Sequence, residues 1–171
     1  MSTPSNDSAT RQTGGAFRLT VRTGEGAIQA AVAPLRATLH SDGTAEPIDP
    51  PHDNAQQWDT AAWIEQSAYP AAPAQGRSYI YGHACHYHVC SFDRLTDVSW
   101  GDTITIHATS QTLTYRVCAR GLSPKAGNLV VPACHQPNAE LVLVTCQYEH
   151  GDTSTDNLVI VANLTAGRTS A

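Results

Sequence analysis

This chain of 171 residues is long enough for one domain with a real hydrophobic core, and its 41% hydrophobic and 15% charged residues exclude a disordered polyelectrolyte or a membrane bundle. The net charge of −5 and the lack of a Lys/Arg cluster exclude nucleic acid as the main partner, because phosphate binding needs a concentrated basic face. No apolar run approaches the ~20 residues that a bilayer-spanning helix needs. We expect a disordered leader over residues 1–16, one domain over 17–165 and a flexible tail over 166–171.

The sequence of the first half of the domain predicts two strands followed by one helix. The strands are expected at residues 27–32 and 38–40, before a turn at Asp42-Gly43. Residues 54–66 are the best helical candidate, because Asn54 can cap the first turn and apolar residues share one face: Trp58, Ala61, Ala62 and Ile64. A Pro-rich stretch ends this helix.

The second half predicts strands alone. Polar and apolar residues alternate over 102–108, as in a half-buried strand. Residues 113–119 are expected to pair with them in a hairpin across a short loop. Further strands are expected at 78–82, and at the nearly continuous aliphatic runs 141–146 and 158–162. Many short strands separated by turns favour an all-β domain that forms a closed or nearly closed barrel.

The five cysteines are an odd number, so two disulfides would leave one thiol free. Cys85 and Cys90 are close in sequence, and Cys118 and Cys134 can bridge one loop, which leaves Cys146. Disulfides would indicate an oxidising, extracytoplasmic compartment. Five reduced, buried cysteines are the alternative.

Cys146 ends the aliphatic strand 141–146, which places a thiol at the mouth of a rigid scaffold. Thiols are mostly protonated at neutral pH, so a nucleophilic cysteine needs a base or a positive neighbour. The alternative is a buried core cysteine at a strand end.

His83 follows the predicted strand 78–82, and Gly82 is expected to let the backbone turn sharply. Two strand ends on one barrel rim can bring an imidazole and a thiol together, although 146 − 83 = 63 positions separate them. Imidazole titrates near neutrality and can protonate a leaving amine. An isolated histidine after a strand is otherwise a surface residue.

An ordered set of short motifs resembles the sortases, closest in style to the class E and class F sortases of actinobacteria. The motifs span about residues 27–164 and are, in order, Ala33-Pro34-Leu35, Asp42-Gly43, Trp63, Tyr81-Gly82-His83, Phe92-Asp93-Arg94-Leu95, Gly101-Asp102-Thr103-Ile104, Leu143-Val144-Thr145-Cys146, and Asp156-Asn157-Leu158-Val159 with Ala162. Each motif is short, and their order is what makes the set specific.

The resemblance implies an eight-stranded β-barrel with one or two short helices. It also implies a cysteine transpeptidase that cleaves a Leu-Pro-x-Thr-Gly-like sorting signal between Thr and Gly, forms a thioester and transfers it to an amine. Cys146 would be the nucleophile and His83 the general acid and then the base. Thr145 would position the substrate backbone, and the segment before residue 140 would line a peptide groove through three apolar residues, Leu129, Val130 and Val131.

The implied partners are surface proteins or pilins with a C-terminal sorting signal, and an acceptor amine on a peptidoglycan precursor or a pilin lysine. No cofactor and no metal are implied. Residues 1–15 lack the apolar core of a signal peptide, so either the protein is not exported or its export segment and membrane anchor were removed from this sequence. The cysteine count and the resemblance favour removal, and hence an extracytoplasmic location at the cell surface.

The sequence departs from the family pattern at the start of the last strand, where sortases usually carry an arginine. That position falls at Asn157, or at Thr155 if the register slips. An asparagine amide can donate to an oxyanion, but it brings no charge. Either Asn157 suffices, or Arg120 or Arg77 reaches the site, or the protein is a weak or inactive sortase-fold peptide-binding protein.

Three other interpretations stay open. The loop from Cys85 to Cys90, with three histidines nearby, can be a metal-binding module, although a disulfide is favoured because no second ligand pair is evident. An acidic set can bind calcium or form a solvated loop: Glu149, Asp152 and Asp156. An L,D-transpeptidase is disfavoured because a compact Ser-His-Gly-Cys motif is missing.

Overall fold

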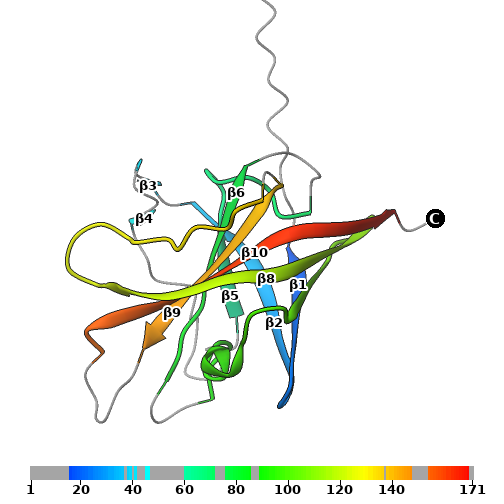
Figure 1. Ribbon diagram of the computed structural model, residues 1–171. Coiled ribbons are helices and arrows are strands. Elements are labelled where there is room, and N and C mark those ends of the chain that lie inside the picture. Colours follow the sequence, from blue (N-terminus) through cyan, green and yellow to red (C-terminus); the bar gives the residue numbers. More distant parts are fainter. Residues whose placement is uncertain are drawn as a thin grey trace, which may run out of the picture.

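Eight strands close into a barrel in the order β1-β2-β5-β6-β9-β10-β8-β7, and β3 and β4 form a separate two-stranded sheet (Figure 1). The computed structural model describes residues 16–36, 38–39, 41, 45–46, 60–71, 76–85, 89–136, 138–147 and 154–169. The strands are β1 Phe17–Thr23, β2 Gly26–Leu35, β3 Thr38–Leu39, β4 Ala45–Glu46, β5 Thr60–Ile64, β6 Arg77–Tyr81, β7 Thr103–His107, β8 Gln111–Pro124, β9 Glu140–Gln147 and β10 Asp156–Thr169. One 3-10 helix, η1, covers Leu95–Asp97. The predicted all-β barrel is confirmed.

Apolar side chains pack on both faces of the barrel wall near β6, β9 and β10. The inward-facing residues form the barrel core, with Leu19, Ile80, Leu143 and Ile160 among its fully buried members. A second group, here the outer cluster, consists of Ile64, Tyr79, Tyr81, Leu129, Val142, Val144, Val159 and Val161. Since both faces of β9 are covered, its sequence is a continuous aliphatic run and lacks the alternation of a half-exposed strand.

The helix predicted over 54–66 is wrong where the structure describes it. Residues 60–64 form β5, which pairs in parallel with β2 and antiparallel with β6. Four consecutive residues of β5 are buried, so period-2 alternation is lost, and a short apolar run of this kind does not distinguish a strand from a helix. Asn54 and Trp58 lie outside the described residues.

Several strand limits differ from the expectation. β1 was not singled out in the sequence, and it pairs with β2 and β7 to close the barrel. β10 extends to Thr169, beyond the expected domain limit at 165, because its last residues pair with β8. Residues 1–15 of the leader predicted over 1–16, and the turn at Asp42-Gly43, lie outside the described residues. Among the described residues, no helix has the length and apolarity that a membrane crossing requires.

Candidate active site at the barrel rim

His83 and Cys146 occupy matching positions because β6 and β9 pair in parallel with a constant offset. Tyr81 lies opposite Val144, which is an offset of 144 − 81 = 63, the same as the separation of His83 and Cys146. The pairing continues past the end of β6, since the Gly82 amide donates to the Val144 carbonyl at 3.1 Å. The register of one strand pair therefore brings the two residues to the same rim.

Asn157 lies on the other side of the nucleophile candidate. It pairs with Cys146 across β9 and β10. Cys146 follows Val142 and Val144 in the outward-facing alternation of β9, so its side chain is on the face of the outer cluster. A cleft of about 270 Å³ collects these side chains, and it is lined by Tyr81, Gly82, His83, Lys125, Val144, Thr145, Cys146 and Asn157.

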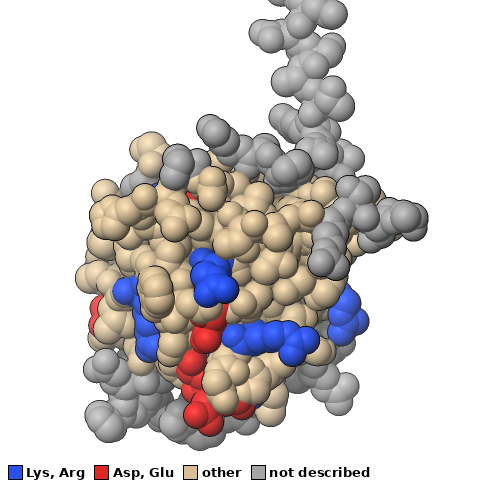
Figure 2. All heavy atoms as spheres, turned by 45° about the vertical axis from the view of Figure 1, so that its right-hand side comes forward, with Lys and Arg blue, Asp and Glu red and all other residues tan. Residues whose placement is uncertain are grey.

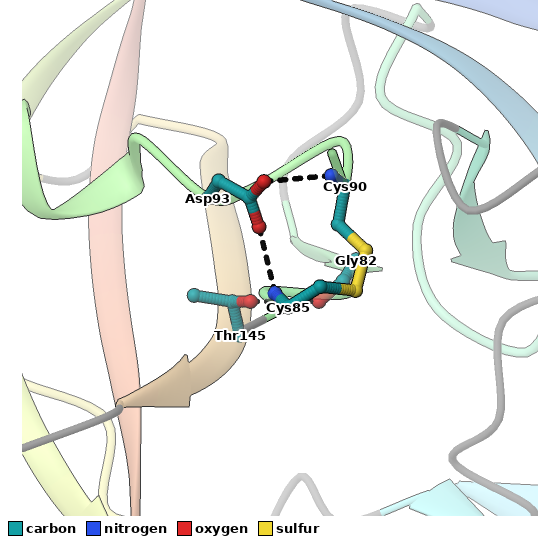
Figure 3. The surroundings of a disulfide bond; sticks show 5 residues. All are labelled: Gly82, Cys85, Cys90, Asp93 and Thr145. Carbon is teal, nitrogen blue, oxygen red and sulfur yellow. Dashed lines mark hydrogen bonds between the residues drawn. A yellow bond between two sulfur atoms is a disulfide. The ribbon is translucent and has the colours of Figure 1, made fainter. Parts of the chain in front are cut away.

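Thr145 connects β9, the strand that contains Cys146, to the backbone next to His83. Its side chain is only 3% exposed, and its hydroxyl donates to the Gly82 carbonyl at 2.8 Å (Figure 3). The Phe92 amide in turn donates to the His83 carbonyl at 2.9 Å. The hydrogen bond that the structure shows for the Thr145 hydroxyl thus fixes the backbone beside His83.

The sequence predicts that Gly82 lets the backbone turn sharply, and the structure shows that it is required for close packing. It is not among the described glycines with positive φ. A Cβ at Gly82 would lie 2.5 Å from a ring carbon of Phe92, whose side chain is fully buried. The ring of Phe92 therefore fills the space that any side chain at position 82 would need.

The packing of Gly82 gives a first prediction. Gly82→Ala should lower the free energy of unfolding by about 1–3 kcal/mol, the usual cost of overpacking. Gly24→Ala is the matched control, since a Cβ there meets nothing within 4 Å. Chemical denaturation of both variants checks this, and equal stability of the two variants would contradict it.

The loop after His83 is closed by the predicted disulfide between Cys85 and Cys90 (Figure 3). Asp93 holds both ends of this loop, because its carboxylate oxygens accept from the Cys85 and Cys90 amides, each at 2.7 Å. The two sulfurs and an Asp93 oxygen lie within 4.8 Å of one another, but the sulfurs are bonded to each other and so are not thiolate ligands. His86 and His88 lie outside the described residues.

The predicted groove residues lie beside the outer cluster. Leu129 is 8% exposed and belongs to the cluster, and Val131 packs against it. Val130 is 57% exposed, and its amide donates to the buried Ser123 hydroxyl at 2.8 Å. Leu129 and Val131 thus face the barrel wall, while Val130 faces solvent.

The second predicted disulfide, Cys118–Cys134, fastens this segment to β8 and leaves Cys146 as the free cysteine. We expect Cys118→Ala/Cys134→Ala to lose about 3 kcal/mol of unfolding free energy, because the bridge constrains an unfolded loop of 16 residues. The shorter bridge, tested by Cys85→Ala/Cys90→Ala, should cost about 2 kcal/mol. Denaturant titration compares the two, and a negligible loss at 118–134 would show that the outer cluster alone holds the segment.

Neither arginine considered in the sequence lines the cleft. The Arg120 guanidinium donates to the carbonyls of Thr96 and Val98 at 3.0 and 2.9 Å. Arg77 pairs with Glu140 at 2.7 Å, at the opposite end of β6 from His83. Arg120 therefore binds the backbone at and after η1, Arg77 binds β9 at its start, and neither contributes a side chain to the cleft.

Lys125, which the sequence did not point to, follows β8 directly. Its Nζ lies 3.3 Å from the Sγ of Cys146. Nothing in the local sequence separates it from an ordinary loop lysine, but it is the single lysine of the whole sequence. On the face of the molecule shown in Figure 2, cationic and acidic side chains are interspersed, without a large basic patch.

Known proteins share the family pattern and the fold. A family model described as "Sortase domain" matches residues 38–165. The chain is similar to sortase E1 from Streptomyces coelicolor, solved with a tripeptide in its active site, at 16% identity and a TM-score of 0.63 over 91% of each chain. It is also similar to a pilus-related sortase C of Group B Streptococcus, at 15% identity and a TM-score of 0.62 over 90% of this chain and 69% of that one.

A third solved structure, sortase A of Listeria monocytogenes, matches at 14% identity with a TM-score of 0.59 over 90% of each chain. At these identities the likeness to solved structures shows the fold alone. No curated protein sequence matches the chain.

Proposed function

Because the chain belongs to the sortase family, whose members are generally cysteine transpeptidases, we propose that it cleaves a Leu-Pro-x-Thr-Gly-like sorting signal between Thr and Gly and transfers the acyl part to an amine. The observation that carries this proposal is the shared register of His83 and Cys146 beside one cleft. A free thiol and an imidazole on a rigid rim are the parts that acyl transfer needs.

In the first half-reaction, the Cys146 thiolate attacks the Thr carbonyl carbon and forms a tetrahedral oxyanion. The C–N bond to Gly then breaks, and His83 gives a proton to the leaving amine. The acyl group remains on Cys146 as a thioester. In the second half, an acceptor amine attacks the thioester, His83 takes the amine proton, and the thiolate leaves.

Asn157 has the position from which an amide can donate to the oxyanion, because it lies opposite Cys146 and lines the same cleft. One such donor typically contributes about 3 kcal/mol of transition-state stabilisation. The apolar wall beside it, with Tyr81 and Val144, suits an extended peptide that buries its hydrophobic residues before the scissile bond. Leu129 and Val131 extend that wall.

The proposed partners are surface proteins or pilins with a C-terminal sorting signal, with a peptidoglycan precursor or a pilin lysine as the amine. The two disulfides suit an oxidising, extracytoplasmic location at the cell surface.

The test is a transfer assay with a small library of sorting-type peptides and an amine-bearing acceptor peptide. We expect mass spectrometry to show cleavage after Thr and a new amide between the Thr carbonyl and the acceptor. Hydrolysis without amide formation would limit the function to a peptidase. No cleavage of any library member would exclude the proposed reaction for these signals.

A second candidate is a weak or inactive sortase-fold protein that binds peptides. Asn157 favours it, since a neutral amide stands at a position where a charged donor is usual in the resembling family. This function predicts that a sorting peptide binds without being cleaved. Calorimetric binding of the library to the same protein separates the two functions.

A further inference from the structure

The cleft contains one cation among its described lining residues, and that cation touches the nucleophile candidate. Lys125 Nζ lies 3.3 Å from Cys146 Sγ, and no other Lys or Arg is among those lining residues. The connection between β9 and β10, residues 148–155, also has no Lys or Arg in its sequence.

The backbone of Lys125 is held beside β10, the strand that contains Asn157 and pairs with β9. Its amide donates to the Thr155 carbonyl at 3.0 Å, which extends the β8–β10 ladder by one step past the pair of Pro124 and Asp156. The following segment is fixed by the Val130 amide on the Ser123 hydroxyl and by the Cys118–Cys134 bridge. The residue is solvent-exposed, but its chain position is fixed within reach of Cys146.

We propose that Lys125 is a catalytic residue whose ammonium group supplies the positive charge at Cys146 that Asn157 lacks. The ammonium donates an N–H···S hydrogen bond to the thiolate and stabilises it before peptide attack. No proton leaves Lys125 in this step. Lys125 stays positively charged throughout. Its ammonium group stabilises the thiolate before the thioester forms, and it stabilises the thiolate again when the acceptor amine releases it.

Other charged or titratable groups near the sulfur come from the neighbouring elements. Tyr81 on β6 and His83 after β6 line the same cleft, and Asp156 on β10 precedes Asn157 in the chain and pairs with Gln147. A histidine cation would act in the same direction as Lys125, whereas the Asp156 carboxylate would act against it. The experiment must therefore change the charge at position 125 alone.

The proposal rests on the proposed function for its catalytic role, but its first measurement needs no peptide. Cys146 is the free cysteine, so the iodoacetamide alkylation rate of the oxidised protein reports on its thiolate. Over the range from about pH 5 to about pH 9, the alkylation rates of the two proteins are compared, and Lys125→Gln should react about tenfold more slowly than wild type near neutrality. Lys125→Arg, which keeps the charge, should stay within about threefold of wild type.

Chemical modification gives a second variant of the same test, because Lys125 and the α-amino group are the only amines on the chain. Reductive methylation keeps the positive charge and should leave the alkylation rate near that of wild type. Acetylation removes the charge and should reproduce Lys125→Gln. Both preparations start from folded protein, so a variant that fails to fold does not decide the result.

Alkylation of Lys125→Gln and of acetylated protein at the wild-type rate over the whole pH range would overturn the proposal. If wild type transfers sorting peptides and these forms transfer them equally fast, Lys125 is a surface lysine while the transpeptidase function stands. If wild type transfers nothing but charge removal slows alkylation, the thiolate role stands and the proposed function fails.

Discussion

Replacing Cys146 with alanine is expected to lower peptide transfer to background, by about 10³-fold or more, because the covalent intermediate can no longer form. Cys146 lies on the outer face of β9 between β6 and β10, and its side chain is partly exposed. The substitution removes the nucleophile without opening a cavity in the barrel core. Steady-state turnover of a fluorogenic sorting peptide, with and without an acceptor amine, measures the loss.

The stability of the Cys146→Ala variant is its control. We expect its free energy of unfolding to differ from that of wild type by no more than about 0.5 kcal/mol, the range of ordinary surface substitutions. Binding of the sorting peptide should persist, because the apolar wall at Tyr81 and Val144 is intact. Turnover retained by the alanine variant would mean that another residue performs the chemistry.

His83→Ala should lower kcat by about 10²- to 10⁴-fold, with a much smaller effect on KM. The reason is that the leaving Gly amine needs a proton and the acceptor amine must lose one, and His83 is the titratable group at the position matching Cys146. Both half-reactions should slow, so the thioester should form slowly and be resolved slowly. Stopped-flow and steady-state assays with the same peptide measure the two steps.

The matched control is His107→Ala, which changes an exposed histidine on β7, paired with β1 and β8. Its turnover should equal that of wild type. Partial rescue of His83→Ala by free imidazole would support a proton-transfer role, since the added base can enter the vacated space. Equal effects of the two substitutions would remove His83 from the mechanism.

Much of this rim could be predicted from the chain because its residues lie at strand ends that are visible in the sequence. The aliphatic run before Cys146 and the short run before His83 each predict a strand, and the structure pairs them in parallel. The odd cysteine count and the positions of the cysteines favoured two bridges and one free thiol over five reduced cysteines, and the structure contains both bridges and the free thiol.

The features that could not be predicted from the sequence depend on contacts between residues far apart in the chain. β5 looked helical because four consecutive residues of this strand, which lies between β2 and β6 in the sheet, are buried, and this removes the period-2 signal. Gly82 looked like a turn residue, but the ring of Phe92 requires it. Lys125 had no local signal, since only the β8–β10 register carries it to Cys146.

The most direct test of the central claim is the mass of the intact protein after brief incubation with a sorting peptide and no added amine. We predict an increase equal to the acyl part ending in Thr, localised to the peptide that contains Cys146 and removed by hydroxylamine, as expected of a thioester. The Cys146→Ala variant should gain no mass. Unchanged wild-type mass with every peptide that is cleaved, or an adduct on any other residue, would contradict a covalent mechanism at this rim.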